Sequence, residues 1–236
     1  MRFPSTANFR RVGAREPCGA LRNLYRSDHL GALDDADARE IAALGITRVL
    51  DFRGVQERAS AACRLPGVAV HSLPIEPTIV QKLGELLAAG QRLTGADVTE
   101  HMQDTYRGFV RHNTPRFAEF FAHLLASDEP TVFHCTAGKD RTGFAAALLL
   151  KAVGASDDEV MHDYLLTNER LELPRESRMG LSHEAMAVLW QVQPDFLRAA
   201  FDEVDRSYGS LEAYFRGGLA VGPAERERLA AWYRAR

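Results

Sequence analysis

The chain has 236 residues, of which 46% are hydrophobic and 26% are charged, and its formal net charge at pH 7 is −3. These values are typical of a globular protein with one sizeable core. The slightly negative charge argues against a general nucleic-acid binder, because such proteins present a strongly basic surface to phosphate groups.

Hydrophobic periodicity and helix-stop signals predict the secondary structure. In chain order we expect a helix over residues 34–44, strands over 46–52 and 68–73, helical segments over 97–126, a strand over 131–134, and helices over 142–153, 157–170, 182–190, 194–207 and 223–232. The segment 97–126 is expected to divide near Thr114 and Pro115, because proline in a helix interior removes a hydrogen bond and clashes with the preceding turn.

The alternation of strands and helices predicts an α/β fold in which a central sheet is flanked by helices. Neither a low-complexity linker nor an internal repeat interrupts the chain, so we expect a single domain over residues 1–236. Residues 78–112 are polar, contain glycines and lie between two core strands. Two interpretations of this segment stay open: an inserted, mobile helical lid, or surface helices that cover the sheet.

A cysteine-containing loop, VFHCTAGKDRTGF at residues 132–144, joins the third strand to an apolar helix. A cysteine attacks as a thiolate, and a position near cations at a helix N-terminus lowers its pKa. The amides of residues 136–141 can curl around one point ahead of the helix and form an anion site. Gly138 permits a positive φ and a close approach of the backbone. The loop therefore predicts an anion site with Cys135 at its floor.

Two basic side chains of this loop can add to the anion site. Arg141 offers a planar fork that matches two phosphate oxygens, and Lys139 adds a point charge. A thiolate beneath a bound phosphoryl group suits an attack that forms a phosphocysteine. A nucleotide-binding Walker A loop is excluded, because Asp140 and Phe133 stand where that motif needs Ser or Thr and Gly.

Other site chemistries find no support in the sequence. Cys18, Cys63 and Cys135 form no C-x-x-C pair and no disulfide framework, so we expect reduced thiols. The stretch HEAMA at residues 183–187 lacks the second histidine of the H-E-x-x-H zinc motif. We therefore expect neither a metal nor another cofactor.

The stretch HCTAGKDRTG resembles the C-x5-R-[S/T] signature of cysteine phosphatases, and its Lys-Asp pair is similar to the atypical bacterial tyrosine/lipid phosphatases. The similarity continues through ANFRRVG, LYRSDHL, GITRVLDFRGVQER, DYLLTNE and YGSLEAYFRGG, with Arg11 where the family usually has Asp. This resemblance implies a protein-tyrosine-phosphatase-like fold. It also implies activity on phosphotyrosine, with phosphoserine and phosphothreonine as candidate further substrates, and on phosphoinositides in some members.

The resemblance implies a role for each residue of the loop. Cys135 would be the nucleophile and Arg141 the clamp on the transition-state phosphate, while Thr142 would donate a hydrogen bond to the departing sulfur. His134 would hold the loop and help to keep the thiolate ionised, or would be a buried histidine without a chemical role. The phosphate-binding residues would be Thr136, Ala137, Gly138, Lys139, Arg141 and Thr142.

The general acid that protonates the leaving group is less clearly marked. Relatives carry an aspartate after the strand that corresponds to residues 68–73, but this chain reads LPIEPTIV and offers Glu76 between two prolines. Asp140 is a second candidate, or alternatively a partner that ties down Lys139 or Arg141, and Asp51 is a third. Lys139 is expected either to bind a second anionic group, such as a neighbouring phosphate on an inositol ring, or to face solvent.

Charged residues at the end of the strand over 46–52 are candidate supports for the loop, because strand carboxyl ends face the site in an α/β sheet. Asp51 and Arg53 lie there, and the alternative is local pairing in which Arg53 reaches Glu57. Arg10 and Arg26 are weaker candidates of the same kind.

Together these observations predict a metal-independent phosphatase of phosphomonoesters that works through a phosphocysteine. The alternatives are a phosphoinositide or inositol polyphosphate phosphatase and, in another class, an inactive phosphopeptide-binding module, which the presence of both Cys135 and Arg141 disfavours. The expected partners are phosphorylated proteins or inositol phosphates, without nucleic acid or stable membrane insertion. The N-terminus lacks the apolar core of a signal peptide, so we expect a cytoplasmic protein, with non-classical secretion left open.

Overall fold

The computed structural model describes residues 3–13, 19–173 and 180–234 and contains a five-stranded sheet of order β1-β2-β5-β3-β4. The neighbouring pairs β2–β5, β5–β3 and β3–β4 are parallel, and β1 is antiparallel to β2 at one edge. The strands are β1 (Arg10–Arg11), β2 (Leu24–Ser27), β3 (Arg48–Asp51), β4 (Ala69–Ser72) and β5 (Thr131–His134). Cys18 lies outside the described residues.

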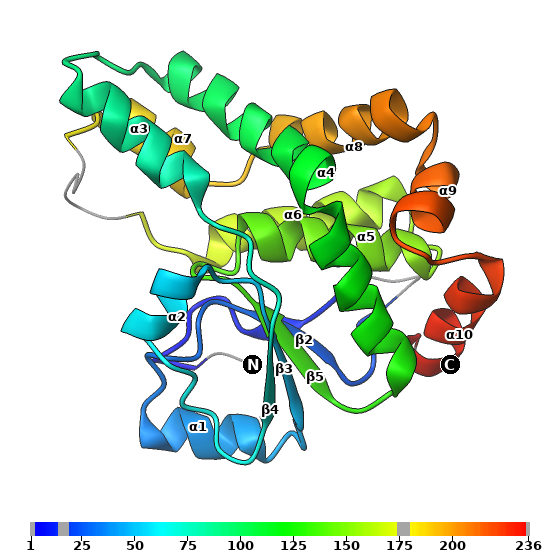
Figure 1. Cartoon of the computed structure of the whole chain (residues 1–236). Coiled ribbons are helices and arrows are strands. Elements are labelled where there is room, and N and C mark those ends of the chain that lie inside the picture. The colour runs from blue at the N-terminus through cyan, green and yellow to red at the C-terminus, as the bar shows by residue number, and fades with distance from the viewer. Residues whose placement is uncertain (1–2, 14–18, 174–179, 235–236) are drawn as a thin grey trace.

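Helices flank the sheet and extend beyond one end of it (Figure 1). They are α1 (Asp35–Ala42), α2 (Val55–Ser60), α3 (Thr78–Ala88), α4 (Gly95–Ala126), α5 (Asp140–Ala152), α6 (Asp157–Arg170), α7 (His183–Trp190), α8 (Pro194–Tyr208), α9 (Leu211–Ala213) with the π-helical turn η1 (Tyr214–Gly218), and α10 (Pro223–Tyr233). The expected α/β architecture, a central sheet between helices, is confirmed. Within the described residues, none of the helices combines the length and apolar character needed to cross a bilayer.

Alternate strand residues supply two hydrophobic cores, one on each face of the sheet. Val49 and Val132 pack with Ile41 of α1 on one face, whereas their neighbours Leu50 and Phe133 join the larger core on the other face. This division follows from the two-residue repeat of a β-strand, whose successive side chains point to opposite faces. The larger core holds the aromatic side chains of α4 and most of α5.

Strand β2 lies in the sheet interior, although periodicity did not predict it. Its sequence, LYRS, contains two polar residues, yet all four residues are buried. Arg26 is buried because it forms an ion pair with the equally buried Asp163 of α6, at 2.6 Å. A charged residue whose partner lies 137 positions away gives no apolar signal, and this explains why the strand was missed.

Helix α4 is continuous over Gly95–Ala126, so the expected division at Pro115 is wrong. The hydroxyl of Thr114 donates to the carbonyl of Val110 (2.7 Å), next to the place where proline lacks an N–H. On both sides of the proline, aromatic residues of α4 are buried in the larger core, where Phe109 and Phe117 both pack against Phe144 of α5. We infer that this packing outweighs the cost of proline in a helix interior.

The segment 78–112 forms α3 and the first half of α4. Figure 1 shows α3 and α7 beyond the carboxyl ends of the parallel strands rather than over a face of the sheet. The interpretation of this segment as helices that cover the sheet is therefore wrong for α3. Its position places α3 beside the loop that follows β5, which is the edge where an α/β sheet positions its ligand.

Candidate active site

The cysteine loop connects β5 to α5 at the carboxyl edge of the sheet. Strand β5 ends at His134 as predicted, and α5 begins at Asp140, two residues earlier than expected. Asp140 and Arg141 therefore belong to the first helical turn rather than to the loop. Cys135 is 2% exposed and follows directly on the last strand residue.

The carbonyl groups of the loop are held on its outer side. The bonds run from His29 N to the carbonyl of Thr136 (2.9 Å), from Asn8 Nδ2 to those of Ala137 (3.0 Å) and Gly138 (2.9 Å), and from Arg26 Nη2 to that of Gly138 (2.9 Å). A trans peptide group is planar, so the next residue's N–H points away from each carbonyl. The amides of residues 137–139 therefore point to the inner side of the loop, as an anion-binding nest requires.

Gly138 is needed for this path of the chain. Its φ is +63°, and a Cβ atom there would lie 2.2 Å from the carbonyl oxygen of Ser27 and 2.6 Å from the amide nitrogen of Asp28. The predicted positive φ and close backbone approach are confirmed, and the backbone that approaches is the end of β2. Any side chain would push the loop away from the sheet.

The guanidinium of Arg141 is fixed by a carboxylate. Nη1 and Nη2 donate to the two oxygens of Glu57 at 2.7 Å and 2.9 Å, and Nη1 also donates to the carbonyls of Ile75 (2.8 Å) and Phe52 (3.4 Å). Within the described residues Nε makes no hydrogen bond. The side of the guanidinium that contains Nε and the second Nη2 proton is thus left to bind an anion bidentately.

Charge near the loop shifts two pKa values in opposite directions. Burial alone would lower the pKa of Arg141, but the charges of the Cys135 sulfur and of Glu57 outweigh it and raise that pKa. Burial alone would raise the pKa of Glu57, yet its hydrogen bonds and charge interaction with Arg141, together with the Thr136 hydroxyl, lower it to about 2. Arg141 is therefore cationic and Glu57 anionic at pH 7.

His134 and Asp51 lie side by side beneath the loop. The ring Nδ1 of His134 is 3.0 Å from the carbonyl oxygen of Cys135, so the histidine holds the loop as expected. Burial, only partly offset by the charge of Asp51, lowers the pKa of His134, and the ring is therefore neutral at pH 7. A neutral ring does not support the expected electrostatic help to the thiolate. Its Nε2 has no hydrogen-bond partner among the described residues.

Asp51 and Arg53 form a local pair. Arg53 donates to the Asp51 carboxylate from Nη2 (2.7 Å) and Nε (3.0 Å), and from Nη1 to the carbonyl of Ala61 (2.7 Å). Burial opposes ionisation of Asp51, but the hydrogen bonds and charge of Arg53 lower its pKa overall. The expected local pairing is present, and Arg53 also reaches Glu57, but it donates from Nη1 to the backbone carbonyl (3.4 Å) and not to the carboxylate, which binds Arg141. Asp51 is not among the residues that line the cavity, which makes it a poor proton donor.

A buried ionic cluster connects the loop to α6. Asp163 binds Arg26 at 2.6 Å and lies 3.9 Å from Nε of Arg10, and it accepts from the amide of Gly13 at 3.1 Å. Burial opposes ionisation of Asp163, but the two arginines lower its pKa. Burial, followed by the charge of Arg26, lowers the pKa of Arg10 to about 9. Arg26 thus supports the loop directly, through the carbonyl of Gly138, while Arg10 shares the Asp163 carboxylate with it and binds Asn8, which holds the same carbonyl.

Lys139 and Asp140 are engaged with neighbouring helices. The ammonium of Lys139 donates to the carbonyl of Leu189 in α7 (2.5 Å) and lies 3.3 Å from Asp140. Lys139 is only 6% exposed, so the interpretation of a solvent-facing charge is wrong. The other carboxylate oxygen of Asp140 accepts from the hydroxyl of Tyr106 in α4 (2.9 Å), and Tyr106 in turn contacts the hydroxyl of Tyr164 (2.7 Å).

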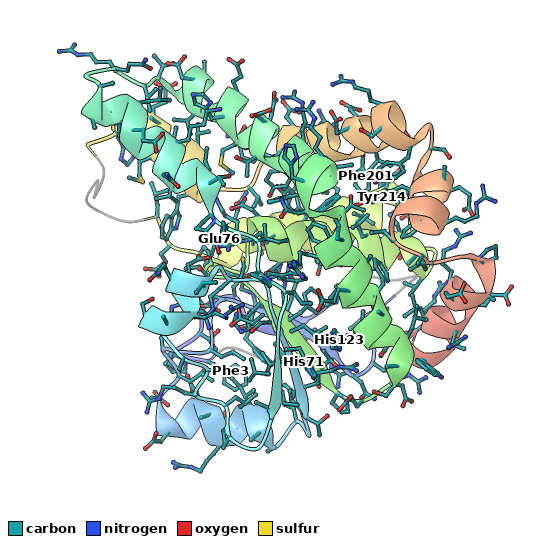
Figure 2. The ribbon with its side chains drawn as sticks, viewed as in Figure 1. Phe3, His71, Glu76, His123, Phe201 and Tyr214 are labelled. Carbon is teal, nitrogen blue, oxygen red and sulfur yellow. The ribbon has the colours of Figure 1, made fainter. Side chains whose placement is uncertain are left out.

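Glu76 lies between β4 and α3, outside the cysteine loop. Figure 2 shows its side chain between α2 and α3, and its carboxylate accepts from the amide of Val55, the first residue of α2 (3.1 Å). It is exposed and lines the cavity. Thr142, in contrast, is buried, and its hydroxyl has no hydrogen-bond partner among the described residues, so the expected bond to the sulfur is not formed here.

A cavity of about 700 Å³ opens above the loop. Its floor includes Cys135 and Arg141, and its walls come from α3, α4 and α7 and from the segment 74–77 that leads out of β4. A volume of this size encloses a drug-sized molecule. Among the described residues no group of three or more His, Cys, Asp or Glu side chains is placed to hold a metal ion.

Glu57, Asn8 and Tyr106 are site residues to which sequence analysis assigned no such role. Glu57 and Asn8 lie in GITRVLDFRGVQER and ANFRRVG, two of the stretches that carried the resemblance. Both residues could have been identified as candidate site residues, because they are polar residues of these stretches for which no role had been proposed. No comparable signal marked Tyr106.

Comparison with known proteins places this geometry in context. The model of a family described as the tyrosine phosphatase family matches residues 1–235. The triple specificity protein phosphatase PtpB of Mycobacterium tuberculosis is 33% identical over 269 residues, covering 96% of this chain and 96% of that protein. A tyrosine-protein phosphatase of Nostoc commune is 31% identical over 162 residues, covering 68% of this chain and 53% of that protein. Among solved structures, the core catalytic domain of the PP-IP phosphatase SIW14 from S. cerevisiae aligns with a TM-score of 0.42 and 14% identity, covering 82% of this chain and 90% of that chain.

Proposed function

The chain belongs to the tyrosine phosphatase family and is a phosphatase, and we propose that it hydrolyses phosphomonoesters through a phosphocysteine formed on Cys135. Phosphotyrosine is the proposed main substrate, with phosphoserine and phosphothreonine as further ones. The observation that carries this proposal is the arrangement of the loop, in which outward carbonyls turn the amides of residues 137–139 inward, above Cys135.

In the proposed mechanism the phosphate is bound by these amides and by the free side of Arg141. The Cys135 thiolate attacks phosphorus, so that an S–P bond forms while the P–O bond to the leaving group breaks and a proton passes to the departing oxygen. Water then attacks phosphorus and gives a proton to the carboxylate that was deprotonated in the first step, the S–P bond breaks, and phosphate leaves as the thiolate is restored. Preorganised donors lower the barrier because they need no reorientation as charge develops in the transition state.

We assign the proton transfer to Asp140. Its carboxylate lines the cavity and is oriented by Tyr106 (2.9 Å). Glu76, the alternative, is exposed and lies in the segment that leads out of β4 rather than beside the loop. A general acid must reach the leaving oxygen within hydrogen-bond distance, and a fixed carboxylate beside the loop supports that geometry.

An inositol phosphate is the alternative substrate class. It would use Lys139 for a second phosphate, and the ammonium would have to release the carbonyl of Leu189. A cytoplasmic location is also proposed, and the free thiols of Cys63 and Cys135 support a reducing compartment.

Replacement of the nucleophile tests the proposal. Cys135→Ser should abolish turnover of p-nitrophenyl phosphate while the melting temperature stays near that of the wild type. Incubation of the wild type with EDTA should leave its rate unchanged, because the proposed chemistry uses no metal. Turnover that survives in Cys135→Ser would reject the nucleophile, and loss of activity on chelation would require a metal mechanism.

A further inference from the structure

The wall of the cavity formed by α4 contains a glycine at its centre. His101, Thr105, Gly108 and His112 lie three or four positions apart, so they share one face of the helix, and all four line the cavity. A Cβ atom at Gly108 would meet a single neighbouring atom within 4 Å, Cδ2 of His112 at 3.9 Å. The position is therefore open toward the cavity.

Neither packing nor backbone conformation requires glycine at this position. A Cβ at Gly143 in α5 would come within 3.0 Å of the ring of Tyr164, whereas the surroundings of Gly108 leave room, and its φ is not positive. Glycine lowers the stability of a helix interior relative to alanine or leucine. What the absence of a side chain at Gly108 provides is space on the cavity side of α4.

The charges on and around this wall suit a polar, neutral group better than a second phosphate. Lys82 and Arg111 both pair with Asp104, at 3.8 Å and 3.5 Å, and Arg111 also binds Glu203 at 2.7 Å. The imidazoles of His101 and His112, at the two ends of this helix face, can each donate and accept hydrogen bonds, as peptide groups require. A second phosphate would have to displace these carboxylates from their cationic partners.

We propose that Gly108 forms a subsite for the peptide chain beside the phosphotyrosine, an inference that rests on the proposed function. With the phosphate on the loop at Cys135, the cavity of about 700 Å³ has room for more than the phosphorylated side chain. The adjoining peptide segment lies against the bare backbone of Gly108, between His101 and His112. Gly108 is thus a specificity-determining residue for phosphotyrosyl peptides.

Gly84 in α3 offers a matched control. It is also a helical glycine without a positive φ, a Cβ there would meet nothing within 4 Å, and it does not line the cavity. Leucine is a good helix former, so Gly108→Leu and Gly84→Leu should each raise Tm by about 2–4 °C. The assay compares kcat/KM for a phosphotyrosyl peptide with kcat/KM for p-nitrophenyl phosphate in both variants and the wild type.

Gly108→Leu should lower the peptide to p-nitrophenyl phosphate ratio at least tenfold, and Gly84→Leu should keep the wild-type ratio. If Gly108→Leu does not fold, Gly108→Ala should lower the ratio in the same direction by a smaller factor. An unchanged peptide ratio in Gly108→Leu would overturn the peptide subsite. The same holds if kcat/KM for phosphoinositide vesicles falls relative to p-nitrophenyl phosphate while the peptide ratio stays unchanged. Failure of the proposed function looks different, because the wild type and Gly84→Leu would then turn over neither substrate.

Discussion

Replacing Glu57 by glutamine removes the negative charge that faces Arg141 and leaves the side chain almost the same size. In the wild type the carboxylate accepts from both Nη atoms of Arg141 at 2.7 Å and 2.9 Å, from the Thr136 hydroxyl and from the amide of Gly54 at 2.8 Å. A glutamine amide would present N–H groups to at least one of these donors. We expect Arg141 to lose its fixed orientation.

The size of the effect on stability follows from the pKa of Glu57. A shift from 4.5 to about 2 corresponds to about 3 kcal/mol at pH 7 as an upper value. The side chain is 19% exposed, so solvent screening is limited, and we expect a loss of about 2–3 kcal/mol, or a fall in Tm of roughly 5–10 °C. Misorientation of a catalytic group by an ångström costs about 10²-fold in rate, and we expect that fall in kcat/KM for p-nitrophenyl phosphate.

The pH dependence gives an independent check with a definite sign. The folded pKa of Glu57 is lower than its unfolded value, so its stabilisation is complete above pH 4.5 and is lost as the pH falls toward 2. The difference in unfolding free energy between the wild type and Glu57→Gln, measured by urea titration, should therefore shrink over that range. A difference that stays constant from pH 7 to pH 3 would refute the assigned charge interaction.

Glu225→Gln is the matched control. Glu225 caps α10 through the amide of Gly222 (2.9 Å), just as Glu57 caps α2 through Gly54, but it lies in the C-terminal helix and not in the cavity wall. This variant loses only a helix cap, so it should keep wild-type kinetics and lose about 1 kcal/mol or less. Glu57→Gln with kinetics equal to those of Glu225→Gln would show that Glu57 does not position Arg141.

Two further predictions concern the proton donor and the loop. With phenyl phosphate as substrate, Asp140→Asn should lower kcat by about 10²–10⁴-fold and remove the basic limb of the pH–rate profile, whereas Glu76→Gln should retain it; the reverse result would assign the acid to Glu76. Gly67→Ala is the reference, because it places alanine at a φ of +71° in open space and should lower the free energy of unfolding by about 1–2 kcal/mol. Gly138→Ala should lower it further. Only Gly138→Ala must also displace the loop from the end of β2, so equal losses in denaturant titrations would contradict the close approach.

The character of the cysteine loop could be predicted from the sequence, because its residues are contiguous in the chain. The strand Thr131–His134, the loop and the apolar helix after it form one local unit, in which the strand places Cys135 and the helix N-terminus follows within five residues. Turn chemistry, helix dipole and residue type act over a few positions, so they can be read without knowing the rest of the fold.

The partners of that unit were decided by tertiary structure. Arg141 binds a carboxylate 84 positions away, and the loop carbonyl of Gly138 is held by a side chain 130 positions away. The sequence pattern also predicted a division of the helix at Pro115, whereas aromatic packing on both sides of the proline keeps α4 continuous. Such contacts depend on how strands and helices meet in space, and short-range sequence pattern carries no information on that. The sequence alone singled out Cys135 and Arg141 as candidate site residues, and only the fold decided that Glu57 holds Arg141 in place.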